Sequence, residues 1–141
     1  MDIYYAGFIP DEGKISVIFP DVPGCVTWGS NMEEAFARAM DALAGHLEAL
    51  ANDDDPIPSP SDHDQALEGL RQLYVELEEG PLPDGAVLHP VPVPEMDTRI
   101  KLVSVSFKQF MLDKIDRKAK AVGMSRSAFL AAAATAYEPA I

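Results

Sequence analysis

Near the C-terminus, Ser125-Arg126-Ser127 combines residue types that hold a phosphate group. Ser125 is suited to cap a helix over residues 126–137. The first turn of such a helix presents free backbone N–H groups and the positive end of its dipole, and Arg126 adds a guanidinium. We predict that Arg126 contacts phosphate. The alternative is that Ser125 only caps the helix and that the nearby basic residues form a solvated face.

No other group of reactive side chains has a spacing typical of a catalytic or metal site. Asp53-Asp54-Asp55 precedes a proline-rich stretch, and three consecutive side chains point in different directions, so we interpret it as a solvated helix end. Cys25 is interpreted as a small buried hydrophobic residue. The histidines lie far apart and the glycines are dispersed, without a phosphate-binding loop. We therefore expect no catalytic residue, metal or cofactor.

The formal charge of −12 is divided unequally along the 141 residues. Residues 1–97 hold 20 acidic and 3 basic side chains, a net charge of −17, whereas residues 98–141 hold 3 acidic and 8 basic ones, a net charge of +5. Such asymmetry indicates separate partners for the two parts of a chain. We predict one domain over residues 1–94 and a second over residues 98–141.

The first domain has the pattern of a small antiparallel sheet with a helix packed on it. Residues 3–9 and 14–19 predict a hairpin, and residues 25–28 a third strand after a Pro-Gly turn. Ser30 and Glu33 have the spacing of a capping box. The helix that follows carries an apolar stripe, which comprises Met32, Phe36, Ala39, Leu43, Leu47 and Leu50.

A proline-rich loop over residues 52–61 and an inserted helix over about residues 62–79 follow in this domain. Gly80-Pro81 predicts the end of that helix. Residues 86–93 are strand-like, and their two prolines confine such a strand to a sheet edge. The predicted stripe of the inserted helix comprises Leu67, Leu70, Tyr74 and Leu77.

The sequence of the second domain predicts a strand over residues 100–107, a helix that ends at Gly123, and a last helix. The first of the two helices has its apolar residues at Leu112, Ile115, Ala119 and Val122. About 40 residues bury too little apolar surface to fold alone, and oligomerisation is a common remedy. We expect this domain to be an obligate dimer.

Residues 100–137 resemble a ribbon-helix-helix DNA-binding domain, through Val103-Ser104-Val105-Ser106-Phe107 and the run from Gly123 to Leu130. In that fold, strands from two chains pair and enter the DNA major groove. The resemblance implies that alternate strand residues face the dimer core and the bases. The implied dimer core is Val103, Val105, Phe107, Leu112, Ile115 and Phe129. The implied DNA-binding set is Lys101, Leu102, Ser104, Ser106, Ser125, Arg126 and Ser127.

The run from Phe19 to Gly29, which begins Phe-Pro-Asp-Val-Pro-Gly-Cys, is similar to HicB antitoxins, as are Met32-Glu33-Glu34-Ala35 and Pro56-Ile57-Pro58. The resemblance implies an α+β protein with a partial RNase H-like first domain. It implies an antitoxin that neutralises a small basic mRNA-cleaving toxin of the HicA kind and represses its own operon by binding operator DNA. The implied assembly is a homodimer through the second domain, with a tetramer left open and the toxin-binding residues unidentified.

Two other functions stay open. One is a stand-alone ribbon-helix-helix regulator whose first domain senses a ligand or a protein. The other is a metal-dependent nuclease using Asp2 or Asp21, although that chemistry needs several converging carboxylates, and the predicted strand interiors contain none. The start Met1-Asp2-Ile3 lacks the features of a signal peptide, no apolar run is long enough for a membrane helix, and we expect a cytoplasmic protein.

Overall fold

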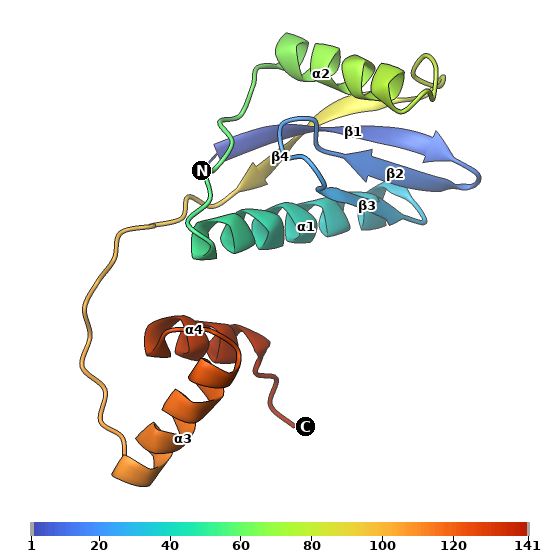
Figure 1. The fold of residues 1–141 in the computed structure, drawn as a ribbon. Helices are drawn as coiled ribbons and strands as arrows, with labels where there is room; N and C mark the ends of the chain where they lie inside the picture. Colours follow the sequence, from blue (N-terminus) through green and yellow to red (C-terminus); the bar gives the residue numbers. More distant parts are fainter. Residues whose placement is uncertain (1, 141) are drawn as a thin grey trace. The chain divides into compact units, whose positions relative to one another are not determined.

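The computed structural model describes residues 2–140. The first residue of the first predicted domain and the last residue of the second lie outside this range. The fold is α+β, with a four-stranded antiparallel sheet and four helices along the described chain (Figure 1). It divides into two compact units: the N-terminal unit extends through Arg99, and the C-terminal unit begins at Ile100.

The sheet of the N-terminal unit has the order β3-β2-β1-β4, and every neighbouring pair is antiparallel. Glu12 and Gly13 connect the first two strands with φ angles of 48° and 84°, which suit a tight hairpin turn. The predicted hairpin and third strand are confirmed, with ends shifted by one or two residues. The strands are β1 (Asp2–Asp11), β2 (Lys14–Ile18), β3 (Val26–Gly29) and β4 (Val87–Val93).

Strand β4 completes the sheet and lies at an edge, as its two prolines predicted. Pro90 pairs with Tyr5 and Pro92 with Ile3 across the β1–β4 ladder. In an antiparallel pair only every second residue of a strand directs its backbone N–H and C=O groups at the neighbouring strand. Proline has no N–H, so Pro90 and Pro92 occupy the positions whose backbone groups point away from β1. The outer edge of β4 is therefore poor in backbone donors.

Helix α1 (Met32–Asn52) covers one face of the sheet (Figure 1). Its buried face consists of small and branched apolar residues, which pack against the core side chains of the strands. Met32 was predicted on this face, but it is exposed because the helix has only just begun there. The buried residues of α1 are Ala35, Ala39, Leu43 and Leu47.

The predicted cap of α1 is wrong by one residue. Asn31 is the N-cap, and its side chain accepts a hydrogen bond of 2.8 Å from the backbone N–H of Glu34. The Glu34 carboxylate accepts from the backbone N–H of Ser30 at 3.3 Å, so Glu34, rather than Glu33, bonds back to the residues before the helix. Serine and asparagine cap equally well, and spacing alone does not choose between them.

The loop over residues 52–61 is anchored to the sheet at two points. The buried Tyr4 hydroxyl donates a 2.6 Å hydrogen bond to the carbonyl oxygen of Pro58. The Asp21 carboxylate accepts from the backbone N–H of Ser61 at 2.7 Å and from its hydroxyl at 2.8 Å. These contacts place the start of the inserted helix.

The inserted helix is α2 (His63–Glu76), capped by a reciprocal Asp62–Gln65 box. It packs on the opposite face of the sheet from α1 (Figure 1), over β1. A Cβ added to Gly7 would lie 2.6 Å from Leu70, so the glycine lets the helix approach the strand. The helix ends at Glu76, before the predicted Gly80, and Leu77 is exposed rather than part of a buried stripe.

The C-terminal unit contains α3 (Gln109–Ala121) and α4 (Arg126–Ala136). Both helices were predicted, and Ser125 is the N-cap of α4 as expected. The predicted strand over residues 100–107 is not formed within this single chain, because a strand needs a hydrogen-bonded neighbour and none is present here. Ile100 and Leu102 are 94% and 95% exposed.

Candidate functional site

The segment before α3 lines a hollow of about 780 Å³ in the C-terminal unit. Val103, Val105 and Phe107 line it together with Leu112 of α3 and Leu130 of α4. All three side chains of the segment are more than one-third exposed. The apolar part of this hollow is left uncovered by a single chain.

The predicted DNA-binding residues divide between those that line this hollow and those that do not. Lys101, Ser106, Arg126 and Ser127 line it. Leu102 and Ser104 are exposed elsewhere on the segment. Ser125 uses its hydroxyl to accept a 3.1 Å hydrogen bond from the backbone N–H of Ala128. Of the predicted dimer core, Ile115 is buried within the unit, and Phe129 is half-buried.

Arg126 is held by an acidic residue that the sequence did not single out. Its guanidinium donates two hydrogen bonds of 2.9 Å to the two carboxylate oxygens of Asp116. The hydrogen bond from Arg126 lowers the pKa of Asp116, and the same bond raises the pKa of Arg126. The residues lie ten positions apart on different helices, so no helical periodicity relates them. A phosphate group would have to compete with Asp116 for the guanidinium.

Helix α3 adds exposed positive charge to this unit. Two lysines lie in its last turn, where they also complement the negative end of the helix dipole. Positive side chains on one helix are suited to phosphate oxygens, which attract them without regard to base sequence. The exposed basic residues of α3 are Lys114, Arg117, Lys118 and Lys120.

Within residues 2–140, no group of three or more His, Cys, Asp or Glu side chains is arranged to hold a metal ion. Asp21 is hydrogen-bonded to Ser61, and Asp53 is the C-cap residue of α1. Cys25 is buried, and burial raises the pKa of its thiol to about 11. The two carboxylates thus hold loop and helix-end backbone in place, and burial disfavours the reactive thiolate of Cys25.

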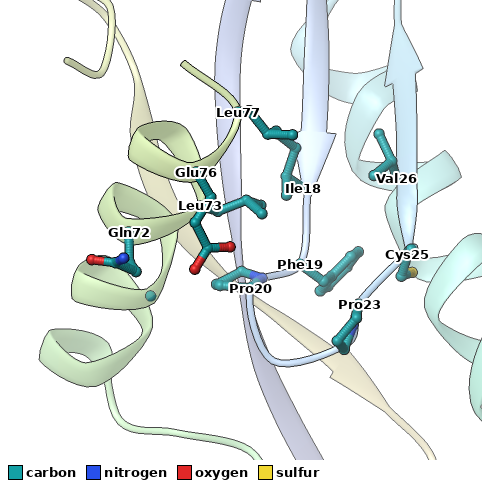
Figure 2. Close-up of a pocket in the computed structure, with 12 residues that line it drawn as sticks. Ile18, Phe19, Pro20, Pro23, Cys25, Val26, Gln72, Leu73, Glu76 and Leu77 are labelled. Carbon is teal, nitrogen blue, oxygen red and sulfur yellow. The ribbon is translucent and has the colours of Figure 1, made fainter. Parts of the chain in front are cut away.

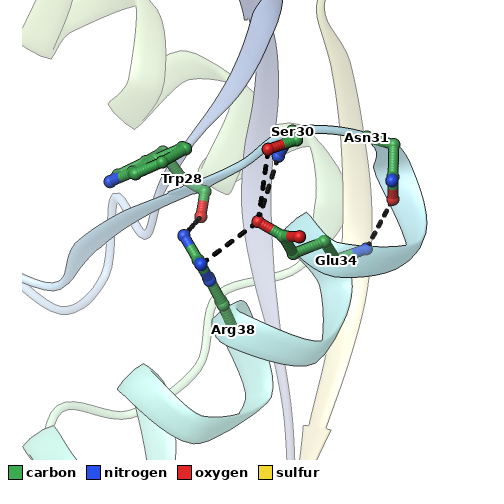
Figure 3. A network of polar contacts seen from close by, with 5 residues as sticks. All are labelled: Trp28, Ser30, Asn31, Glu34 and Arg38. Atoms are coloured by element: carbon green, nitrogen blue, oxygen red, sulfur yellow. Dashed lines mark hydrogen bonds and ion pairs between the residues drawn. The ribbon is translucent and has the colours of Figure 1, made fainter.

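Trp28 of β3 is exposed, and charged side chains lie over its ring and beside its backbone (Figure 3). Its ring lies 4.7 Å from the guanidinium carbon of Arg38 and 5.1 Å from the ammonium of Lys14. Arg38 also donates a 3.1 Å hydrogen bond to the Trp28 carbonyl and lies 3.2 Å from the Glu34 carboxylate. The contacts fix α1 against β3. They also leave an ordered aromatic ring on the surface, a type of residue that is enriched in protein interfaces.

No helix within the described part of the chain is long and apolar enough to cross a membrane.

A known protein family matches most of the chain. The family model described as "HicB_like antitoxin of bacterial toxin-antitoxin system" matches residues 8–134, across both units. "Antitoxin HicB 2" of Photorhabdus laumondii is 40% identical over 64 residues, 45% of this chain and 46% of the relative. "Antitoxin HicB 1" of the same organism is 42% identical over 50 residues, 36% of this chain and 32% of the relative. These alignments span less than half the length of each relative.

Solved structures resemble the chain over nearly its whole length. The crystal structure of the Burkholderia pseudomallei antitoxin HicB has a TM-score of 0.61 and 29% identity, and the match covers 96% of this chain and 95% of that one. A chain of a toxin–antitoxin complex from Streptococcus pneumoniae has a similar fold, with a TM-score of 0.56 at 21% identity, covering 95% and 97%.

Proposed function

Because the chain belongs to the family of HicB-like antitoxins of bacterial toxin–antitoxin systems, we propose that it neutralises a small basic mRNA-cleaving toxin of the HicA kind and represses its own operon. The N-terminal unit binds the toxin, and the C-terminal unit binds operator DNA. The observation that carries this proposal is the family match over residues 8–134, which includes both units.

The charge of the N-terminal unit supports the toxin-binding role. An RNA-cleaving toxin must attract a polyanion, and residues 1–97 carry a net charge of −17. Opposite charges speed the encounter of two proteins, and a docked protein covers the surface that would meet RNA. Inhibition of this kind requires no catalytic residue in the antitoxin.

The C-terminal unit supports DNA binding as a dimer. Its exposed segment has apolar side chains that a second copy would cover by pairing strands, as in a ribbon-helix-helix domain. The basic residues of α3 and the start of α4 would then contact phosphate. The predicted homodimer, the base-facing serines and the partial RNase H-like relationship of the first unit stay predictions of this proposal.

Co-expression of the tagged chain with the proteins encoded beside it tests the proposal. We expect a basic protein of under about 100 residues to co-purify, to stop growth when it is expressed alone and to be harmless in the complex. The co-purified mass, measured at moderate salt, identifies it. Recovery of DNA without any protein partner would instead favour the stand-alone regulator.

A further inference from the structure

The face of the sheet that carries α2 is only partly covered. Helix α2 packs over β1 through Ala66 and Leu70, which are buried. On the β2 and β3 side of the helix, Val26 is 59% exposed and Leu77 is 57% exposed. A hydrophobic strip therefore remains open along this side of the helix.

Two hollows lie along this strip, with volumes of about 430 and 300 Å³. Ile18, Val26 and Leu77 line both of them, so the hollows form one continuous surface, which we term the α2 groove. Figure 2 shows Leu73 and Glu76 of α2, with the C-cap residue Leu77, on one side of its larger hollow and the turn after β2 on the other.

The turn that forms this second wall is the Phe-Pro-Asp-Val-Pro-Gly-Cys run of the sequence. Phe19 and Cys25 are buried, and the two prolines of the run line the hollow beside them. Asp21 of the same run bonds to Ser61, just before α2, so one residue fixes the turn and the start of the helix relative to each other. Both walls of the groove are thus held in place before anything binds.

The charged residues that line the α2 groove are all acidic. Glu76 lines the larger hollow, and Asp11 and Glu79 line the smaller one, whereas no lysine or arginine lines either. An apolar floor with carboxylates beside it fits a segment with both apolar and basic side chains. It does not fit a second acidic surface of the same kind, because like charges would face each other.

We propose that the α2 groove is the site at which this chain binds its basic protein partner. The partner inserts aliphatic or aromatic side chains between α2 and the turn after β2, and its lysines or arginines pair with the groove carboxylates. The inference rests on the proposed toxin neutralisation and assigns it to a surface. The inserted helix is then a wall of the partner site as well as a cover for β1.

Neutral substitutions on α2 test the apolar part of the proposal. Leu77→Gln removes a groove side chain, and Val75→Gln makes the same kind of change at a residue that is 65% exposed but lines neither hollow. The probe is the small basic protein that co-purifies with the wild-type chain, separated from it, refolded and titrated by calorimetry. We expect Leu77→Gln to weaken binding about tenfold and Val75→Gln to leave it within about twofold.

The acidic part is tested with a second matched pair. Glu76→Gln should weaken binding at low salt by about threefold to fivefold and reduce its salt dependence. The reason is that a charge at the rim of an interface mainly raises the rate at which oppositely charged proteins associate. Glu68→Gln removes the same charge from an exposed site on α2 that lines neither hollow, and should have less effect. Circular dichroism confirms that every variant keeps the fold.

The outcomes separate the groove from the proposed function. If the wild-type chain binds the basic protein and both groove variants bind it equally well, the groove assignment is wrong and toxin binding lies elsewhere. If the wild-type chain binds no such protein, the proposed function fails, and the assignment fails with it. If Leu77→Gln changes the sedimentation of the chain alone but not its affinity for the partner, a second copy occupies the groove, and the proposal is overturned.

Discussion

Single residues in this protein often have a partner that limits what they can do. Arg126 has the charge and position for a phosphate contact, yet its Nε and Nη2 already donate hydrogen bonds to the Asp116 carboxylate. Asp21, one of two carboxylates considered for a nuclease, is bonded to Ser61. In each case the nearest neighbour, rather than the residue type, determines the chemistry that is available.

Asp116→Asn should strengthen DNA binding and steepen its salt dependence, because it removes the anion that competes with phosphate for Arg126. Arg126→Ala should weaken binding to all sequences and reduce the salt slope by about one. Fluorescence anisotropy at several salt concentrations measures both effects. Asp113→Asn is the matched control, since Asp113 accepts from Gln109 and not from an arginine. If Asp113→Asn raises the DNA affinity as much as Asp116→Asn does, the gain comes from the change in net charge and not from the release of Arg126.

Cys25 should react slowly with alkylating reagents in the folded protein at pH 8, since burial raises the pKa of its thiol from 9.0 to about 11. The folded state disfavours the thiolate. The stability contributed by the neutral thiol is therefore complete below pH 9 and is lost as the pH rises towards about 11. Mass spectrometry of the alkylated protein with and without denaturant checks the reactivity. Equal rates in the two conditions would contradict the prediction.

Helices and strands meet here at close contacts beside two glycines. Gly7 lies under Leu70 of α2, and Gly29 lies against the backbone of Ala35 in α1. At Gly7 an added Cβ would meet the far end of a side chain, which can move. At Gly29 it would meet backbone atoms at 2.3 Å, which cannot move without shifting the helix.

Gly29→Ala should therefore lower the free energy of unfolding more than Gly7→Ala does. For the first we expect a loss of about 3 kcal/mol or more, and for the second about 1 kcal/mol, within the range for overpacked sites. Gly45→Ala should stabilise the protein by about 0.5–1 kcal/mol, because Gly45 is inside α1 with nothing within 4 Å. Urea unfolding measures all three. A Gly29→Ala protein as stable as the wild type would refute the close contact.

The sequence predicted elements that depend on local chemistry. The Asp11-Glu12-Gly13 turn, the edge prolines of β4 and the Ser125 cap each depend on a few neighbouring residues, and all three are present. The Asp116–Arg126 pair and the α2 groove were not predicted, because each forms between separate elements whose packing the local pattern does not give. Leu77 shows the same limit: its spacing suggested a buried stripe, but it lies just after the last residue of α2 and is exposed.

For the whole molecule, the unpaired segment before α3 is the feature that assembly should change most. Val103 and Val105 are exposed in the single chain, and such apolar exposure over consecutive alternate residues favours a partner. A dimer formed there would present two N-terminal units, each with its own acidic surface. In such a dimer each chain would carry both the proposed toxin-binding unit and half of the proposed DNA-binding unit.

Val105→Asp should yield a monomer that does not bind DNA, because it places a charge inside the paired ribbon. Ser104→Asp places the same charge on the alternate face, so it should keep the dimer while weakening DNA binding by repulsion from phosphate. Analytical ultracentrifugation gives the oligomeric state, and an electrophoretic mobility shift gives the binding. If the Val105→Asp protein is a dimer with normal DNA affinity, the residues assigned to the dimer core and to the DNA side of the strand are the wrong way round.

The outer edge of β4 has a consequence for how this protein behaves at high concentration. The two prolines supply no donors there, and the Pro90 carbonyl lies 2.8 Å from the ring nitrogen Nδ1 of His89. Strands of another molecule find few backbone groups to pair with at that edge. Growth into filaments needs two edges on every sheet that can pair with another strand, so any edge-to-edge association of this sheet would stop after two molecules.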